Sequence, residues 1–140
     1  SVHSGLNMDA QKATERVITA IANPYTTILG HMTGRLLLHR KGFPIDHIAV
    51  INACAEFNVI IEINAHPFRL DIDWRWVHQA LDKGVILSIN PDALSISGYD
   101  HMQYGVITGR KGGLTAEQTL NAWPLERVQS YFQDRKANIH

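Results

Sequence analysis

Short apolar runs alternate with helix-like segments along most of this chain. The strongest run covers residues 59–64 and is almost continuously apolar, which suits a parallel strand covered on both faces. Similar runs cover residues 26–30 and 85–89, and a shorter one stands at residues 1–3. Parallel strands need long crossovers, which are usually helical and right-handed. The alternation therefore predicts an α/β fold with about four, mainly parallel strands and flanking helices.

Aspartates mark the starts of three predicted helices. Asp9, Asp46 and Asp73 each precede a helix-like segment, and an aspartate at the N-cap accepts hydrogen bonds from the free N–H groups of the first turn. We expect the first helix to end before Pro24, because the residue preceding a proline avoids the helical region. The second is expected to end at Asn58, since asparagine tolerates the left-handed conformation of a helix end.

Two more helices are predicted near the C-terminal end. Thr115 and Gln118 have the spacing of a capping box, and Pro124 suits the first turn of a helix. In the third aspartate-capped helix, the spacing of the apolar residues predicts that Trp74 packs inward.

The composition limits the possible functions. The chain has 140 residues, the size of one domain, and no linker or repeat marks a boundary within residues 1–140. Thirteen basic residues balance thirteen acidic ones, whereas strong non-specific binding of nucleic acids usually goes with a basic surplus. A local basic groove stays open as an interpretation, because Arg35, His39, Arg40 and Lys41 lie close together. Such a cluster is more often a solvated loop.

The single cysteine excludes an intramolecular disulfide. Cys54 lies in an apolar, helix-like segment, which favours a buried structural thiol over a nucleophile. No apolar stretch reaches the length of a membrane span, and the first residues lack the plan of a signal peptide. We therefore expect a cytoplasmic protein with no membrane partner.

Metal-type ligands follow three of the apolar runs. His3, His31 and Asp92 each stand where a strand is expected to end. In α/β folds, binding and catalytic groups collect at the carboxyl ends of the strands. The repetition predicts one site that is assembled from several strand ends.

Several further segments, taken together and in order, carry a family resemblance. The chain resembles the C-terminal half of a PHP (polymerase and histidinol phosphatase) domain, of the type attached to bacterial family X DNA polymerases, over essentially all of its length. The segments that carry the resemblance are Ser1–Ser4, Gly30–Leu37, Glu62–Ala65, Arg69–Trp76, Ile89–Ala93, Tyr104–Val106 and Gly112–Thr115.

The resemblance implies a fold, a cofactor and a reaction. The family fold is a distorted (β/α)7 barrel, of which residues 1–140 would form a single partial domain, the C-terminal portion. A cluster of divalent metals (zinc or manganese) would hydrolyse phosphoesters, and the polymerase-linked branch acts as a 3′–5′ exonuclease on DNA. By resemblance, His3, His31 and Asp92 match metal ligands, and the substrate would be DNA or a small phosphoester. Metal ions suit this reaction because they polarise a phosphoryl oxygen and acidify bound water.

Two departures from the family limit the site. Leu94 stands where the family has the histidine of its closing Asp-x-His motif, and we expect its side chain to fill the space of that histidine. The first half of the barrel lies outside these residues, so the metal site is incomplete and the chain alone is expected to be inactive. We expect its open strand edges to be buried in a homo-oligomer or against the missing N-terminal half of the barrel. The alternative is a degenerate, non-catalytic scaffold or interaction module.

Each candidate ligand has a structural alternative. His3 could be an exposed terminal histidine, and His31 a loop histidine bonded to backbone. Asp92 could cap the turn that follows it, since aspartate readily accepts hydrogen bonds from nearby amides. His66 could add a ligand at a strand end, although a surface histidine before a proline is the simpler interpretation.

The supporting residues also have two interpretations. Glu62 and Asn64 share one face of their strand and could hold other site groups by hydrogen bonds, or could simply be satisfied by neighbouring backbone. Arg35 could clamp a substrate phosphate with two parallel hydrogen bonds, or could form an ion pair with Asp71 or Asp73.

Overall fold

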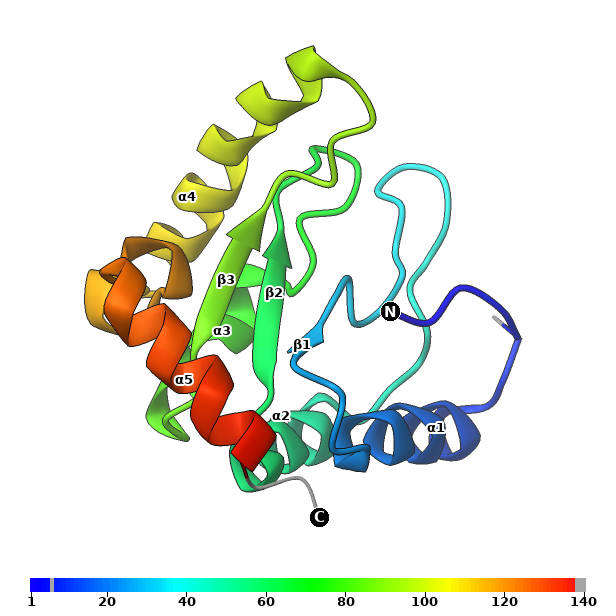
Figure 1. The fold of residues 1–140 in the computed structure, drawn as a ribbon. Helices are drawn as coiled ribbons and strands as arrows, with labels where there is room; N and C mark the ends of the chain where they lie inside the picture. The colour runs from blue at the N-terminus through cyan, green and yellow to red at the C-terminus, as the bar shows by residue number, and fades with distance from the viewer. Residues whose placement is uncertain (6, 138–140) are drawn as a thin grey trace.

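The computed structural model describes residues 1–5 and 7–137 and shows a mixed α/β fold (Figure 1). Three parallel strands form the sheet, in the order β1 (Ile28–Leu29), β2 (Ile60–Asn64), β3 (Leu87–Asn90). The predicted parallel α/β arrangement is confirmed. The described residues contain three sheet strands, not about four, because residues 1–3 pair with no strand.

In the described residues, five α-helices and three 3₁₀ turns accompany the sheet. They are α1 (Ala10–Ala22), α2 (His47–Phe57), α3 (Trp74–Asp82), η1 (Ile96–His101), α4 (Met102–Lys111), η2 (Ala116–Gln118), η3 (Leu120–Ala122) and α5 (Leu125–Ala137). In Figure 1, α3 lies behind the sheet, and α4 rises beside β3. Helix α1 packs on α2, α2 packs on α3, and α4 packs on β2 and β3. Within the described part of the chain, no helix is both long and apolar enough to cross a membrane.

The three predicted helix starts and the predicted end of the second helix are confirmed. Asp9, Asp46 and Asp73 accept hydrogen bonds from N–H groups of the first turns of α1, α2 and α3. Asn58 ends α2 in the left-handed region, with φ of 54°. Strand β2 is covered on both faces as predicted, since all five of its residues are buried. Burial raises the pKa of the nearby Cys54 thiol to about 12, as expected of a structural cysteine.

Two local predictions are wrong. Thr115 makes no capping hydrogen bond, and residues 116–122 form two 3₁₀ turns instead of a helix. The reason is tertiary, because Thr119 pairs with Leu87 and draws this segment along the edge of β3. Trp74 is 39% exposed instead of packed inward, and the ammonium of Lys111 lies 4.4 Å from the centre of its ring.

The edge of β3 is closed by a side chain. Asn121 accepts a hydrogen bond from the backbone N–H of Ile89 at 2.8 Å and donates one to its carbonyl at 2.9 Å. One amide thus takes the place of a neighbouring strand. Helix α5 then runs to the opposite end of the sheet, where Arg135 donates to the carbonyl of Phe57. This leaves the carboxyl ends of the strands uncovered by α5.

Candidate functional site

Polar groups gather at the carboxyl ends of the three strands. His31 follows β1 by two residues, Glu62 and Asn64 lie on β2, and Asp92 follows β3 by two residues. Because all three strands are parallel, these ends share one edge of the sheet. His31 and Asp92 thus lie at the same edge, but the strands before them are not adjacent, and the exposed His3 follows no strand.

The carboxylate of Glu62 joins the three strand ends. Its Oε2 accepts hydrogen bonds from the backbone N–H of His31 at 2.6 Å and from Asn64 Nδ2 at 3.3 Å. Its Oε1 accepts one from Asn90 Nδ2 at 2.9 Å. A Cβ atom at Gly30 would lie 2.4 Å from Ser1 Oγ and 3.3 Å from this carboxylate, so glycine there leaves room for both. The hydrogen bonds suggested for Glu62 and Asn64 are present, and their role in a substrate site stays a prediction.

His31 carries the most exceptional side chain of the edge. It is 7% exposed, and its Nδ1 is buried without a hydrogen-bond partner. Burial, followed by the positive charge of Arg69, lowers its pKa, which favours the neutral imidazole that metals bind. The ring of His3 lies edge to face against it, with 5.0 Å between centroids. The two histidines singled out from the sequence therefore lie together.

Asp92 lies apart from this pair. Its Oδ2 accepts a hydrogen bond from Arg69 Nε at 3.1 Å in an ion pair. Strands β1 and β3 are separated by β2, which puts their backbones roughly 10 Å apart. Among the described residues, no three of His, Cys, Asp and Glu are placed to hold one metal ion. His3, His31 and Asp92 therefore do not form one ligand group within residues 1–5 and 7–137, and their roles as metal ligands stay predictions.

Leu94 does not fill the site. Its side chain is 99% exposed, so the prediction that it occupies the space of a histidine ring is wrong. The chain turns at Asp92, which has a φ of 53°, and carries Leu94 out into solvent.

Arg35 is held by protein groups. Its Nη1 donates to Asp73 Oδ2 at 2.8 Å, its Nε donates to the carbonyl of Arg69 at 2.7 Å, and its Nη2 donates to the carbonyl of Leu70. The structure shows the ion-pair alternative, with Asp73 as the partner. Hydrogen bonds from Arg75 and then from Arg35 hold the pKa of Asp73 well below its usual range. A phosphate contact by Arg35 stays a prediction.

Asp71 is a supporting residue that sequence reasoning named only as a possible ion-pair partner. It is fully buried, and its Oδ2 accepts hydrogen bonds from Thr33 N, Thr33 Oγ1 and Gly34 N at 3.0, 2.8 and 3.0 Å. Burial raises its pKa. In the sequence, the position of this aspartate between the apolar residues Leu70 and Ile72 was the feature that could have indicated its burial. Asp71 fixes the loop that follows His31 to the loop that follows β2.

Unusual backbone conformations also gather at this edge. His31, Leu70 and Asp92 have φ values of 26°, 45° and 53°, a region that residues with a side chain seldom adopt. Such conformations persist only where the surrounding contacts enforce them, and they are common at functional sites.

Comparison with known proteins finds relatives of this chain among a DNA polymerase/3′-5′ exonuclease and probable phosphatases. No protein-family model matches the sequence. The chain is 36% identical over 133 residues to the DNA polymerase/3′-5′ exonuclease PolX of Bacillus subtilis (strain 168), covering 95% of this chain and 23% of that protein. It is 25% identical over 137 residues to a probable phosphatase of Thermoanaerobacter sp. (strain X514), covering 94% of this chain and 53% of that protein.

A probable phosphatase of Caldanaerobacter subterraneus subsp. tengcongensis is 26% identical over 137 residues, with 94% of this chain and 51% of that protein covered. The chain thus spans about a quarter of the polymerase and about half of each phosphatase. By sequence, this chain is homologous to the C-terminal half of a PHP domain of the type attached to bacterial family X DNA polymerases.

Proposed function

We propose that the chain is the C-terminal segment of a PHP-type metal-dependent phosphoesterase and contributes part of its metal site. The observation that carries this proposal is the buried His31 imidazole, whose Nδ1 has no partner and whose ring contacts His3 at the carboxyl edge of the sheet. Homology to a polymerase-exonuclease and to probable phosphatases supports phosphoester hydrolysis as the reaction.

The two imidazoles fit a divalent ion such as zinc or manganese, but they are too few. Zinc sites in proteins generally use three or four protein ligands, and the described residues offer no group of three. We therefore place the remaining ligands outside the described residues, in the preceding part of a distorted (β/α)7 barrel or in a second copy. A bound ion would polarise a phosphoryl oxygen and acidify water, while Glu62 positions His31 through its backbone N–H.

A second candidate function is a non-catalytic scaffold. It is favoured by Leu94, which replaces the family histidine and points into solvent, and by the ion pair that engages Asp92 with Arg69. In this case the edge would support an attached polymerase without reacting.

A chimera separates the two functions. The matching segment of the Bacillus subtilis PolX protein is replaced by this chain, and 3′–5′ exonuclease activity is measured with manganese. The catalytic proposal expects activity that His31→Ala abolishes and that His78→Ala, a change at an exposed histidine on α3, leaves intact. A chimera that folds but is inactive supports the scaffold instead.

The isolated chain gives a complementary test. We expect no turnover of single-stranded DNA or of a generic phosphate ester with added manganese or zinc. Clear turnover that His31→Ala abolishes would show that the site is complete without further ligands, and would contradict the proposal of an incomplete site.

A further inference from the structure

Five aromatic rings from three separate segments form a continuous row beside the candidate site. His39 comes from the loop after β1, and His66 and Phe68 come from the loop after β2. His101 ends η1, and Tyr104 lies in the first turn of α4. Along the row, from His39 through Phe68, His66 and His101 to Tyr104, successive ring centroids are 5.5, 5.5, 4.9 and 6.2 Å apart.

Three of these rings are exposed and those of His66 and His101 are half-buried, so packing of the core does not explain the row. Phe68 is 48% exposed, Tyr104 is 41% exposed, and His39 is also exposed. The contacts between His39 and Phe68 and between His66 and His101 are edge to face, at 80° and 74°. Edge-to-face contacts of this kind stabilise the relative orientation of the rings.

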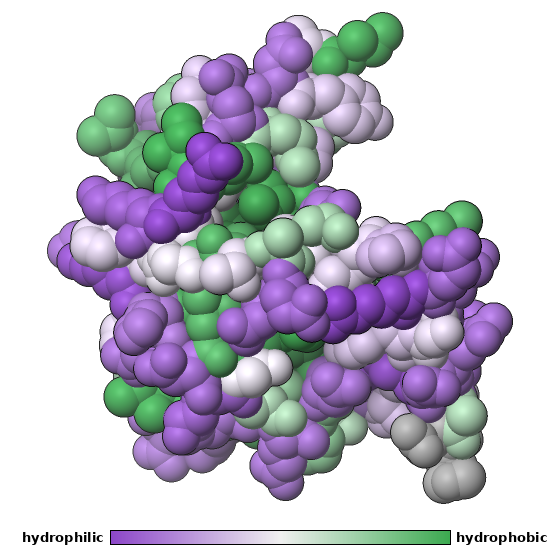
Figure 2. All heavy atoms as spheres, turned by 90° about the vertical axis from the view of Figure 1, so that its left-hand side faces the viewer, coloured by the Kyte–Doolittle hydropathy of each residue, from purple (hydrophilic) through white to green (hydrophobic). Residues whose placement is uncertain are grey.

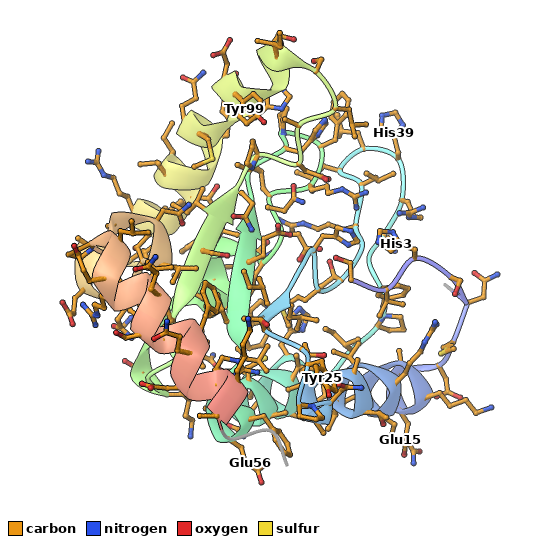
Figure 3. The ribbon with its side chains drawn as sticks, in the orientation of Figure 1. His3, Glu15, Tyr25, His39, Glu56 and Tyr99 are labelled. Atoms are coloured by element: carbon orange, nitrogen blue, oxygen red, sulfur yellow. The ribbon has the colours of Figure 1, made fainter. Side chains whose placement is uncertain are left out.

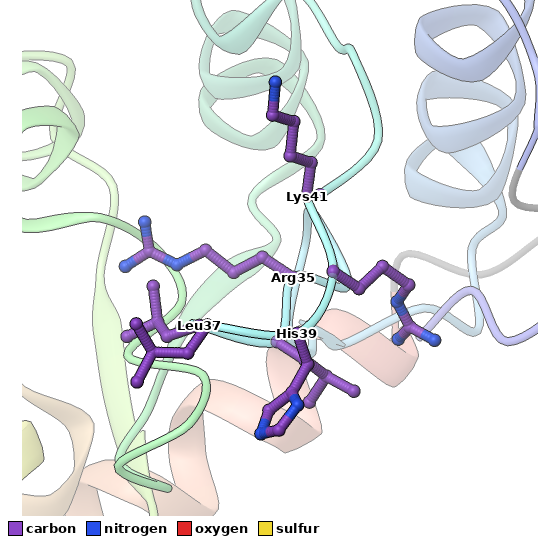
Figure 4. A pocket seen from close by; sticks show the side chains of 8 residues that line it. Arg35, Leu37, His39 and Lys41 are labelled. Atoms are coloured by element: carbon purple, nitrogen blue, oxygen red, sulfur yellow. The ribbon is translucent and has the colours of Figure 1, made fainter.

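Positive charge lies at one end of the row. The loop that carries His39 also carries Arg40 and Lys41, and it lines a hollow of about 410 Å³ (Figure 4). Figure 4 shows the side chains of this loop spreading outward. No carboxylate of the described residues forms an ion pair with Arg40 or Lys41. Asp92, whose charge acts on His66 in the middle of the row, is paired with Arg69.

We propose that this ring row, together with Arg40 and Lys41, binds single-stranded nucleic acid. Unpaired bases stack on aromatic rings whatever their sequence, and cations at one end contact the phosphates. Because the chain carries no basic surplus, stacking on the rings has to supply most of the affinity. The proposal rests on the proposed function and deepens it, because the row would hold the strand whose phosphodiester meets the His31 edge.

Binding can be measured without any reaction. Fluorescence anisotropy of a labelled oligothymidylate of about 12 nucleotides is followed at low salt with a chelator that removes divalent metals. Binding is compared with that of a strand of the same length that lacks bases. A duplex and an oligouridylate are measured in the same way. Failure of catalysis leaves this result unaffected, and failure of binding leaves the catalytic test unaffected.

The variants separate stacking from charge and from folding. Phe68→Ala and Tyr104→Ala should each weaken binding of oligothymidylate about ten-fold and leave the weak binding of the base-free strand unchanged. Lys41→Ala should weaken both by a similar factor. Tyr25→Ala, which removes an aromatic ring that is 78% exposed at the other end of the molecule from His39, is the control and should change nothing (Figure 3).

Several results would overturn the proposal. They are equal affinity for the strands with and without bases, an effect of Tyr25→Ala as large as that of Phe68→Ala, or a preference for duplex. Unchanged binding in both ring variants, with wild-type melting curves, would do the same. Equal binding of oligothymidylate and oligouridylate supports recognition of unpaired bases in general, and a preference for one of them identifies the natural strand.

Discussion

Two substitutions of the buried Asp71 should differ sharply in their effect on stability. Burial raises the pKa of this carboxyl group, which favours a neutral acid in the folded protein. Its Oδ2 accepts three hydrogen bonds from the loop after His31, whereas its Oδ1 is buried without a partner. Asparagine has the shape of the neutral acid, and its oxygen can take over the three hydrogen bonds. Alanine can make none of them.

The size of the difference follows from the hydrogen bonds. Each contributes about 1 kcal/mol net, and a buried donor that loses its acceptor costs at least as much. Gly34 N also donates to the carbonyl of His31, so its loss is partly compensated. We therefore expect Asp71→Ala to lower the free energy of unfolding by about 2–3 kcal/mol, and Asp71→Asn by less than about 1 kcal/mol.

Urea unfolding, followed by tryptophan fluorescence, measures both values. The same measurements over a range of pH test the direction in which stability changes with the charge of Asp71. Above its ordinary value of 3.8, Asp71 loses its proton in the unfolded chain before it does so in the folded one, so wild-type stability falls as pH rises towards the raised folded pKa. The stability of the wild type relative to Asp71→Asn should thus be larger near about pH 4 than at neutral pH. Equal losses for Asn and Ala at neutral pH would contradict the expectation that the hydrogen bonds to Oδ2 account for most of the contribution of Asp71.

Three further predictions follow from other parts of the structure. Asn121→Ala should lower the free energy of unfolding by about 1–2 kcal/mol and speed amide exchange at Ile89, as nuclear magnetic resonance would record; unchanged exchange would contradict the pairing. Leu38 has a φ of 67° and is 97% exposed, so Leu38→Gly should be about 0.5–1 kcal/mol more stable to urea than Leu38→Ala. The face that carries α4 and α5 shows apolar side chains among charged ones (Figure 2). Ile107 on α4 and Leu125 on α5 are exposed, so light scattering at micromolar concentration should find a homo-oligomer, and a compact monomer would contradict this.

Features set by local chemistry could be predicted from the sequence. An aspartate acts on the helix turn directly after it, which is why Asp9, Asp46 and Asp73 could be identified as caps. Strand β2 could also be predicted, because a parallel strand that is buried on both faces has a nearly continuous apolar sequence. Parallel pairing then placed His31 and Asp92 at one edge.

Features set by distant contacts could not be predicted. Helix α4 contains Gly105 and Gly109, which lower helix propensity, and it was missing from the expected elements. A Cβ atom at Gly105 would come within 2.4 Å of Ile89 and 2.7 Å of Ala65, so glycine is required by packing on the sheet. The separation of Asp92 from His31 likewise depends on β2 standing between their strands and on the position of Arg69.

The amide of Asn121 also limits how the chain can polymerise. Growth of a ribbon through strand pairing needs two free edges on every molecule, one to receive and one to offer. With β3 closed by Asn121 and Thr119, the sheet in the described part of the chain has a single open edge, along β1. Two copies joined through that edge have none left for a third, so strand exchange terminates at a pair instead of extending into a fibre.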